Sequence, residues 1–412
     1  MRFAQYILIV AFLALPAAPA LAQDDNNCLL CHQSFEGDDG PSHRFSRDIH
    51  FQHSILCHEC HGGDPALDDM DEVRESDNWR GVPSHGEVPN FCARCHSDPS
   101  YMHEHNPGLP TDQLAKYKTS VHGQLLLEEG DSNVANCVSC HSSHQIGTAK
   151  MPHSSTHPQN IPDMCGSCHA NEDHMSGYGI PTDQVSDYKQ SVHGEALLVD
   201  GDLAAPACND CHGNHGASPP GVGSLSAVCG TCHAFQMDLF NKSPHGAAFA
   251  DYGFPMCEAC HGNHKITSPT DDWVGTADPA VCTECHSEDD GTRAFQVAAG
   301  ISHTLDSLVS QRTLARQKLA KASDLGMMTS ELEFTLKDVT QNLIETRTMV
   351  HSFSLEKVQE EANDGFAKAE EVRQQAAGLI DEYYFRRKGL GLATLFITIL
   401  AVTLWLKIRR LD

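Results

Sequence analysis

The sequence predicts a mainly α-helical protein with extensive loops, which continues into a long helical arm and one C-terminal transmembrane helix. Three observations predict this fold class. The 18 cysteines fall in closely spaced Cys-x-x-Cys pairs, which leave room for short helices and loops rather than for sheet. Residues 291–388 contain no proline and carry apolar side chains at helical intervals. Residues 389–406 form an uncharged apolar run.

The chain is acidic and poor in aromatic residues. Its 412 residues include 55 Asp and Glu against 28 Lys and Arg, a formal net charge of −27. This balance excludes nonspecific binding of nucleic acid, because neutralising phosphates needs a basic face. Aromatic residues make up 7% of the chain, which is little to fill a core of this size. We therefore expect a group other than protein to supply part of the core.

The two ends of the chain predict its location. Residues 1–22 combine a basic start at Arg2 with an apolar run and small residues before Gln23, the pattern of a cleaved secretory signal. Residues 389–406 lie between two basic clusters and are long enough for one spanning helix. An exported body followed by such a helix leaves residues 407–412 in the cytoplasm. We expect a single-pass protein of the cytoplasmic (inner) membrane with its body in the periplasm.

All the cysteines belong to one motif, Cys-x-x-Cys-His. Two thiols about one helical turn apart can form thioethers with the two vinyl groups of one porphyrin, and the adjacent imidazole can then ligate the iron. Zinc or disulfide chemistry gives no reason for a histidine after every pair, so we predict nine covalently bound haem c groups. The thiols are those of Cys28, Cys31, Cys57, Cys60, Cys92, Cys95, Cys137, Cys140, Cys165, Cys168, Cys208, Cys211, Cys229, Cys232, Cys257, Cys260, Cys282 and Cys285. The proximal iron ligands are His32, His61, His96, His141, His169, His212, His233, His261 and His286.

Part of the chain is duplicated. Residues 109–131 superpose without a gap on 180–202, with the same amino acid at more than half of the positions, including Tyr-Lys-x-Ser-Val-His-Gly. The apparent unit is a haem motif, a spacer with x-His-Gly, and a second haem motif that ends in His-x-x-His. In the first unit Asp64 stands where the final histidine is expected. The ninth motif stands alone, with His303 after His286 at a spacing within the range of the other units.

The repeats also supply candidates for the distal ligand of each iron. In His-x-x-His both imidazoles lie on one helix face, so the second must serve a different iron from the first. The candidates are the spacer histidines His50, His122, His193, His245 and His303 and the paired histidines His144, His215 and His264. These eight candidates leave one of the nine irons without a distal ligand. We choose His85, in Pro-Ser-His-Gly, as the ninth, with His43, His53, His103, His105 and His174 as alternatives.

The stretch from Cys28 to His303 resembles the multihaem c-type cytochromes of the periplasm. Its Cys-x-x-Cys-His-Gly-Asn-His and Lys-x-Ser-x-His-Gly elements are similar to those of the group that joins cytochrome c3-like carriers, quinol-dehydrogenase cytochromes and hydroxylamine-oxidoreductase-like octahaem proteins. The resemblance implies mostly bis-histidine, low-potential haems that pass single electrons. A nine-haem body with a C-terminal anchor departs from the quinol-dehydrogenase pattern of an N-terminal anchor with four or five haems. This departure argues against direct oxidation of quinol.

Residues 291–388 are predicted to form a helical arm or hairpin. A first helix is expected from about 293 to 324, ended by Gly326, and Ser330 with Glu333 forms a capping box for the next. That second helix either runs unbroken into the membrane or turns at 363–365. Its polar positions form a solvated face or the flank of a coiled coil in a homo-oligomer. The haem region before the arm divides into 23–104, with haems one to three, and 105–290, with haems four to nine.

The predicted function follows from the density of cofactors. Nine haems within residues 28–286 leave too little protein to insulate them from one another. Haems with both axial positions filled exchange electrons but cannot bind substrate at iron. We predict an electron relay in anaerobic respiration, with no catalytic residues, from a membrane quinol-oxidising partner (cytochrome b-like) to a periplasmic acceptor or reductase. The alternative is an enzyme that reduces a small nitrogen or sulfur oxyanion at one five-coordinate haem, with the Asp64 unit as its location.

Overall fold

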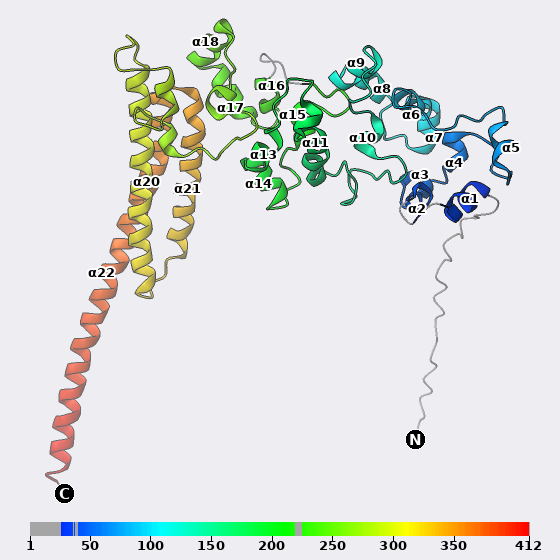
Figure 1. Cartoon of the computed structure of the whole chain (residues 1–412). Coiled ribbons are helices and arrows are strands. Elements are labelled where there is room, and N and C mark those ends of the chain that lie inside the picture. The colour runs from blue at the N-terminus through cyan, green and yellow to red at the C-terminus, as the bar shows by residue number, and fades with distance from the viewer. Residues whose placement is uncertain (1–25, 36, 38–39, 219–224, 412) are drawn as a thin grey trace, which may run out of the picture. The chain divides into compact units, whose positions relative to one another are not determined.

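The structure, a computed structural model, describes residues 26–35, 37, 40–218 and 225–411. The expected signal segment 1–22 lies outside the described residues. These residues form helices and loops and contain no β-strand, which confirms the predicted fold class (Figure 1). The chain divides into two compact units, residues 1–167 with 213–218 and residues 168–212 with 219–412.

The first unit consists of short helices joined by loops. The longest of them have nine residues, and the last, α11, runs across the unit boundary. The helices are α1 (Asn27–Phe35), α2 (Pro41–Phe45), α3 (Ile49–Gln52), α4 (Cys57–His61), α5 (Met70–Arg74), α6 (Val88–His96), α7 (Pro99–His105), α8 (Gln113–Thr119), α9 (Val121–Leu127), α10 (Cys137–His141), the 3-10 helix η1 (Pro158–Asn160) and α11 (Ile161–His169).

The second unit begins with short helices of the same kind and ends in three long ones. The short helices are α12 (Glu172–Met175), α13 (Gln184–Lys189), α14 (Val192–Leu198), α15 (Cys208–His212), α16 (Leu225–Gly230), α17 (Ala234–Asn241), α18 (Pro244–Tyr252), α19 (Glu258–His261), η2 (Asp271–Trp273) and η3 (Val281–Glu284). The long helices are α20 (Ala294–Asp324), α21 (Ser330–Met349) and α22 (Leu355–Ile408), with the 3-10 turn η4 (Val350–Ser352) between the last two.

The apolar core is concentrated in the long helices. One cluster gathers around Val339 and Val372 and a second around Leu308 and Leu343, all fully buried, and both are built from α20, α21 and α22. Between residues 26 and 290 the described buried apolar side chains are scattered and form no such cluster. The short helices therefore lack an apolar core of their own, as the low aromatic content led us to expect.

The three long helices lie side by side as a bundle (Figure 1). α20 covers the predicted first helix, and Gly326, at φ 76°, follows its end. The N-cap of α21 is Thr329 rather than the expected Ser330, and the Thr329 hydroxyl donates a hydrogen bond to Glu333 Oε1 at 2.8 Å. The expected hairpin thus gains a third helix, because the chain breaks again after Met349.

The second break lies at 350–354 instead of at 363–365. Phe353 adopts a left-handed conformation at φ 49°, and the Ser354 hydroxyl accepts a hydrogen bond from the backbone N–H of Lys357 to start α22. Residues 363–365 lie inside α22, where Gly365 is buried. The glycine there allows close helix packing and does not form a turn.

Gly365 gives a test of the bundle. A Cβ atom at this position would lie 2.2 Å from Asn342 Oδ1 and 3.0 Å from Leu308 Cδ1, so Gly365→Ala is expected to destabilise the bundle by about 1–3 kcal/mol. The matched control is Gly378→Ala in the same helix, where no atom lies within 4 Å. It should stabilise the bundle by about 0.5–1 kcal/mol, because glycine is unfavourable inside a helix. Thermal unfolding followed by far-UV circular dichroism measures both, and equal midpoints for the two variants would refute the packing argument.

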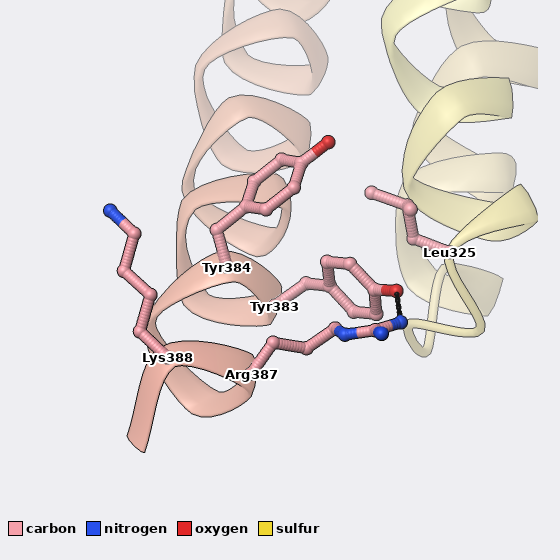
Figure 2. Close-up of a pocket in the computed structure, with 5 residues that line it drawn as sticks. All are labelled: Leu325, Tyr383, Tyr384, Arg387 and Lys388. Carbon is pink, nitrogen blue, oxygen red and sulfur yellow. Dashed lines mark hydrogen bonds between the residues drawn. The ribbon is translucent and has the colours of Figure 1, made fainter. Parts of the chain in front are cut away.

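The C-terminal part of α22 continues beyond the bundle (Figure 1). All its side chains from 389 to 406 are exposed, and α22 is the described helix that is long and apolar enough to cross a membrane. Just before this run, Tyr383, Tyr384, Arg387 and Lys388 line a shallow groove with Leu325, and the Arg387 guanidinium donates to the Tyr383 hydroxyl at 2.7 Å (Figure 2). Tyrosine and basic residues at the end of an apolar run are typical of a membrane–water interface.

Candidate haem sites

Five of the Cys-x-x-Cys-His motifs form or end short α-helices. α4, α10 and α15 each consist of the five residues of one motif, and α6 and α11 end on the motif histidines His96 and His169. Asn136 starts α10 by accepting a hydrogen bond from the backbone N–H of Val138. None of the 18 cysteines, all of which lie in described parts of the chain, forms a disulfide. Because the two cysteines of a motif are three residues apart, a helical motif presents both thiols on one face, as two thioethers to one porphyrin require.

Seven motif histidines each face a second imidazole in the described part of the chain. The ring centroids of the seven pairs are 5.8 to 6.3 Å apart. The pairs are His50–His96, His61–His144, His141–His215, His193–His233, His212–His264, His245–His286 and His261–His351.

These separations fit one metal ion between two imidazoles. A metal–imidazole bond is about 2 Å long, and each ring nitrogen lies about 1.1 Å from its ring centre, given ring bonds near 1.33 Å. Two bonds in line therefore place the ring centres about 6 Å apart. Directly stacked rings would be much closer together than this. The residues present fit an iron with two axial histidines.

Six of the seven pairs fall into two classes by the angle between their rings, and the His261–His351 pair, at 21°, belongs to the nearly parallel class. The pairs that contain His144, His215 or His264 are nearly parallel, with interplanar angles of 21°, 17° and 12°. The pairs that contain the spacer histidines His50 and His245 are nearly perpendicular, at 77° and 86°, and the His193 pair is intermediate at 36°. The second histidine of each His-x-x-His thus faces a motif histidine other than its own neighbour.

Hydrogen bonds donated by Nδ1 orient several of these rings. The Nδ1 atom of His61 donates to the carbonyl of Gly81 at 2.8 Å, and that of His50 lies 2.9 Å from Asp48 Oδ1. His286 Nδ1 lies 3.1 Å from a carboxylate oxygen of Asp290. A proton held on Nδ1 leaves Nε2 with the lone pair that a metal needs.

Asp48 gives a test of this orientation. It is fully buried, its Oδ1 contacts His50 Nδ1, and its Oδ2 accepts from the backbone N–H of Ile146 at 2.7 Å. A buried carboxylate on the ligand favours ferric iron, so Asp48→Asn is expected to raise the midpoint potential of the haem at Cys92 and Cys95 by tens of millivolts. Spectroelectrochemical titration measures this shift. Asp64→Asn, which changes an exposed carboxylate that accepts from the N–H of Ala66, should leave every potential unchanged, and an equal shift in both variants would contradict the assignment.

The local structure explains why serine and glycine flank the histidine in the Ser-x-His-Gly spacers. In the two central copies Ser120 and Ser191 accept hydrogen bonds from the backbone N–H of Gly123 and Gly194, and so start α9 and α14. A Cβ at Gly194 would lie 2.1 Å from the Tyr188 carbonyl oxygen, so only glycine permits this close approach of two helices. The serine and the glycine therefore hold the histidine between them at the first turn of a helix.

His85 lies in a different setting. Its Nε2 donates to the Val134 carbonyl at 2.8 Å, and its Nδ1 accepts from the Asn136 amide at 3.2 Å. Both ring nitrogens are thus engaged by the chain itself. Gly86 has no atom within 4 Å of its ideal Cβ, so the close packing of the true spacers is missing here.

The remaining predicted ligands lie on helices of both units. His303 is exposed on α20, and no imidazole of the described residues faces it. His32 and His122 lie in α1 and α9, and His169 ends α11. The residue that sequence reasoning missed is His351, in the turn η4 of the helical bundle, which faces His261. No repeat surrounds it, so no pattern in the sequence marks it.

Burial favours neutral imidazoles at these sites. Loss of solvent lowers the pKa of His96, His141, His193, His215, His245, His261 and His264, and a facing imidazole lowers it further in all of them except His215. For His215 the second cause is Lys116. Metal ligation requires the neutral ring, so the environment favours the form that binds iron.

Successive motifs also lie close to each other. In the first unit the side chains of Cys92 and Cys137 lie close enough that each shifts the pKa of the other, and in the second unit the same holds for Cys229 and Cys257. Each of these cysteines is the first of its motif, and the two motifs of each pair are consecutive in the sequence. Porphyrins attached at such neighbouring points have little protein between them.

Comparison with known proteins supports the same chemistry. No curated protein matches the chain. Residues 245–291 match the family model of the doubled CXXCH motif. This stretch contains the motifs at Cys257 and Cys282 and the facing histidines His245 and His286. The doubled motif indicates covalently bound haem c and a multihaem c-type cytochrome.

Proposed function

We propose that this chain is a membrane-anchored electron-transfer cytochrome of the periplasm that carries nine haem c groups. The facing imidazoles carry the proposal. Seven pairs of facing imidazoles support a histidine ligand on each side of the iron, which would leave no open site for a substrate at those irons. Haem iron held by two histidines supplies one-electron transfer.

The protein residues provide attachment and orientation. The cysteines fix each porphyrin, and the hydrogen bonds of Asp48, Gly81 and Asp290 hold ligand rings in position. The adjacent thiols of consecutive motifs support an order of electron transfer that follows the chain. The apolar end of α22 supports an anchor that keeps this relay at the membrane.

The charge of the chain suggests how partners dock. A net charge of −27 favours a periplasmic acceptor with a Lys- or Arg-rich surface, with an association rate that falls as ionic strength rises. The donor in the proposal is a quinol-oxidising membrane subunit of the cytochrome b type.

Reduction by a menaquinol analogue tests the proposal. The purified full-length chain in liposomes should stay oxidised with the quinol analogue alone and become reduced when a cytochrome b-type quinol dehydrogenase is added. Its oxidised electron paramagnetic resonance spectrum should be low-spin and should not change with nitrite or hydroxylamine. Rapid reduction without the dehydrogenase would refute the need for a partner, and a new signal with nitrite or hydroxylamine would favour an oxyanion reductase.

A further inference from the structure

The turn between α21 and α22 reaches two haem motifs of the second unit. It consists of η4 and the left-handed Phe353, and it packs against α17. One turn before it, Arg347 donates two hydrogen bonds to the carboxylate of Asp271 at 2.8 and 2.7 Å. Two residues after Asp271, the Trp273 ring lies 5.9 Å from that of His261. The bundle is therefore fixed to the haem region at this point.

His351 has the geometry of an axial ligand. Its ring lies 6.1 Å from that of His261 at an interplanar angle of 21°, the same values as for His61 and His144. Its Nδ1 donates to the Thr348 carbonyl at 2.9 Å, which leaves Nε2 available for a metal. The ring thus matches the near-parallel class of pairs, although it comes from outside every repeat.

The order of the other pairs shows why a ligand from the bundle is needed here. His144, His215 and His264 each face the motif histidine that lies two motifs earlier in the sequence: His61, His141 and His212. By this order His261, in the eighth motif, would require a tenth motif, which the sequence does not contain. His351 faces His261 and so occupies the position that the histidine of a tenth motif would take.

Phe353 contacts the ligand of the next haem. Its ring lies 3.9 Å from that of His245, which in turn faces His286. The Nδ1 atom of His245 is buried and has no hydrogen-bond partner among the described residues. Packing against Phe353 therefore orients the His245 ring. In His61 and His286, by contrast, a hydrogen bond donated by Nδ1 orients the ring. A phenylalanine at φ 49° is an unfavourable backbone conformation that the surrounding contacts must hold.

We infer that the turn at His351–Phe353 of the three-helix bundle contributes directly to two haem sites. His351 is the distal ligand of the haem at Cys257 and Cys260. Phe353 is a positioning residue for His245, the distal ligand of the haem at Cys282 and Cys285. The inference rests on the haem attachment in the proposed function. It adds that the turn preceding α22, the helix proposed to enter the membrane, contacts the ligands of the last two haems.

The His351 assignment is tested by spectroscopy of the intact haem-loaded protein. In His351→Ala the haem content by mass should be unchanged, while about one iron in nine should become high-spin and bind added cyanide. Added imidazole should restore the low-spin spectrum. His351→Met keeps six ligands, so its iron should stay low-spin with a raised midpoint potential. His303→Ala tests the rival candidate of the same bundle, which the repeats suggest as a ligand but which is exposed in the structure; it should resemble the wild type because His351 supplies the ligand.

The outcomes separate this inference from the proposed function. A wild-type spectrum for His351→Ala, with no cyanide binding, would overturn the ligand assignment, as would a high-spin iron in His303→Ala instead. If the wild-type chain carried no haem, the proposed function itself would fail. For Phe353, the Ala variant should keep all irons low-spin but shift the resonance anisotropy and the potential of one haem, and Phe353→Tyr should restore both. An unchanged spectrum and potential in Phe353→Ala would overturn the positioning role.

Discussion

A chain exported without haem attachment is expected to lose the structure of residues 26–290 and to keep the three-helix bundle. The reason is the distribution of the core. Both described clusters of buried apolar side chains belong to α20, α21 and α22, while the short helices before them bury only scattered residues such as Phe45, Leu126 and Leu197. Helices of four to nine residues are not stable alone in water. Without the porphyrins these segments have nothing to pack against.

Expression in cells that lack cytochrome c maturation supplies the test. Limited proteolysis should leave a resistant fragment that starts near residue 294, and the far-UV circular dichroism should retain the helix signal of the bundle alone. The haem-loaded protein, treated in parallel, should resist cleavage between its motifs. Protection of residues 26–290 in the haem-free chain would show that side chains alone form a core there.

A chain ended after Lys388 is expected to leave the membrane fraction entirely. The last buried side chain of the bundle core is Ile380, so the truncation removes no packing contact. It removes the Leu, Ile, Phe and Val residues of 389–406, which together favour insertion by about 3–6 kcal/mol on the biological scale. The truncated protein should appear in the soluble fraction with an unchanged haem spectrum and an unchanged bundle melting temperature.

Fractionation after an alkaline carbonate wash measures this effect. A chain that ends after Arg410 keeps the apolar run and should remain with the membranes, which makes it the matched control. Retention of the shorter chain through the wash would contradict a single anchor and point to a second membrane attachment.

Much of the fold could be predicted because its signals are local. A Cys-x-x-Cys-His motif determines a short helix within its own length, as in α4 and α10. The apolar periodicity predicts the first long helix closely at its start, at Ala294. The break before Leu355 could not be predicted, because Phe353 takes a left-handed conformation that is normally occupied by glycine or asparagine. Packing against His245, which is distant in the sequence, stabilises that conformation.

In the candidate site, too, only the features with a local sequence signal could be predicted. The repeats identify histidines such as His144 and His193 as ligand candidates, but which ring each one faces depends on how separate segments fold together. His85 matches the spacer pattern in letters, yet its ring nitrogens bind Val134 and Asn136. His351 matches no pattern, since it lies far beyond His286, the last motif histidine. A short motif contains no information about contacts between such distant segments.

The backward direction of the near-parallel pairs has a consequence for biogenesis. If the chain is exported from its N-terminus, as proposed, His61 crosses the membrane well before His144, its opposing ring, and His261 crosses well before His351. In that case each of these motif histidines gains its opposing ring only after a later segment has crossed. The pair at His261 would be completed after residue 351 has crossed the membrane. A nascent chain cut short anywhere before residue 351 would leave its eighth site unfinished.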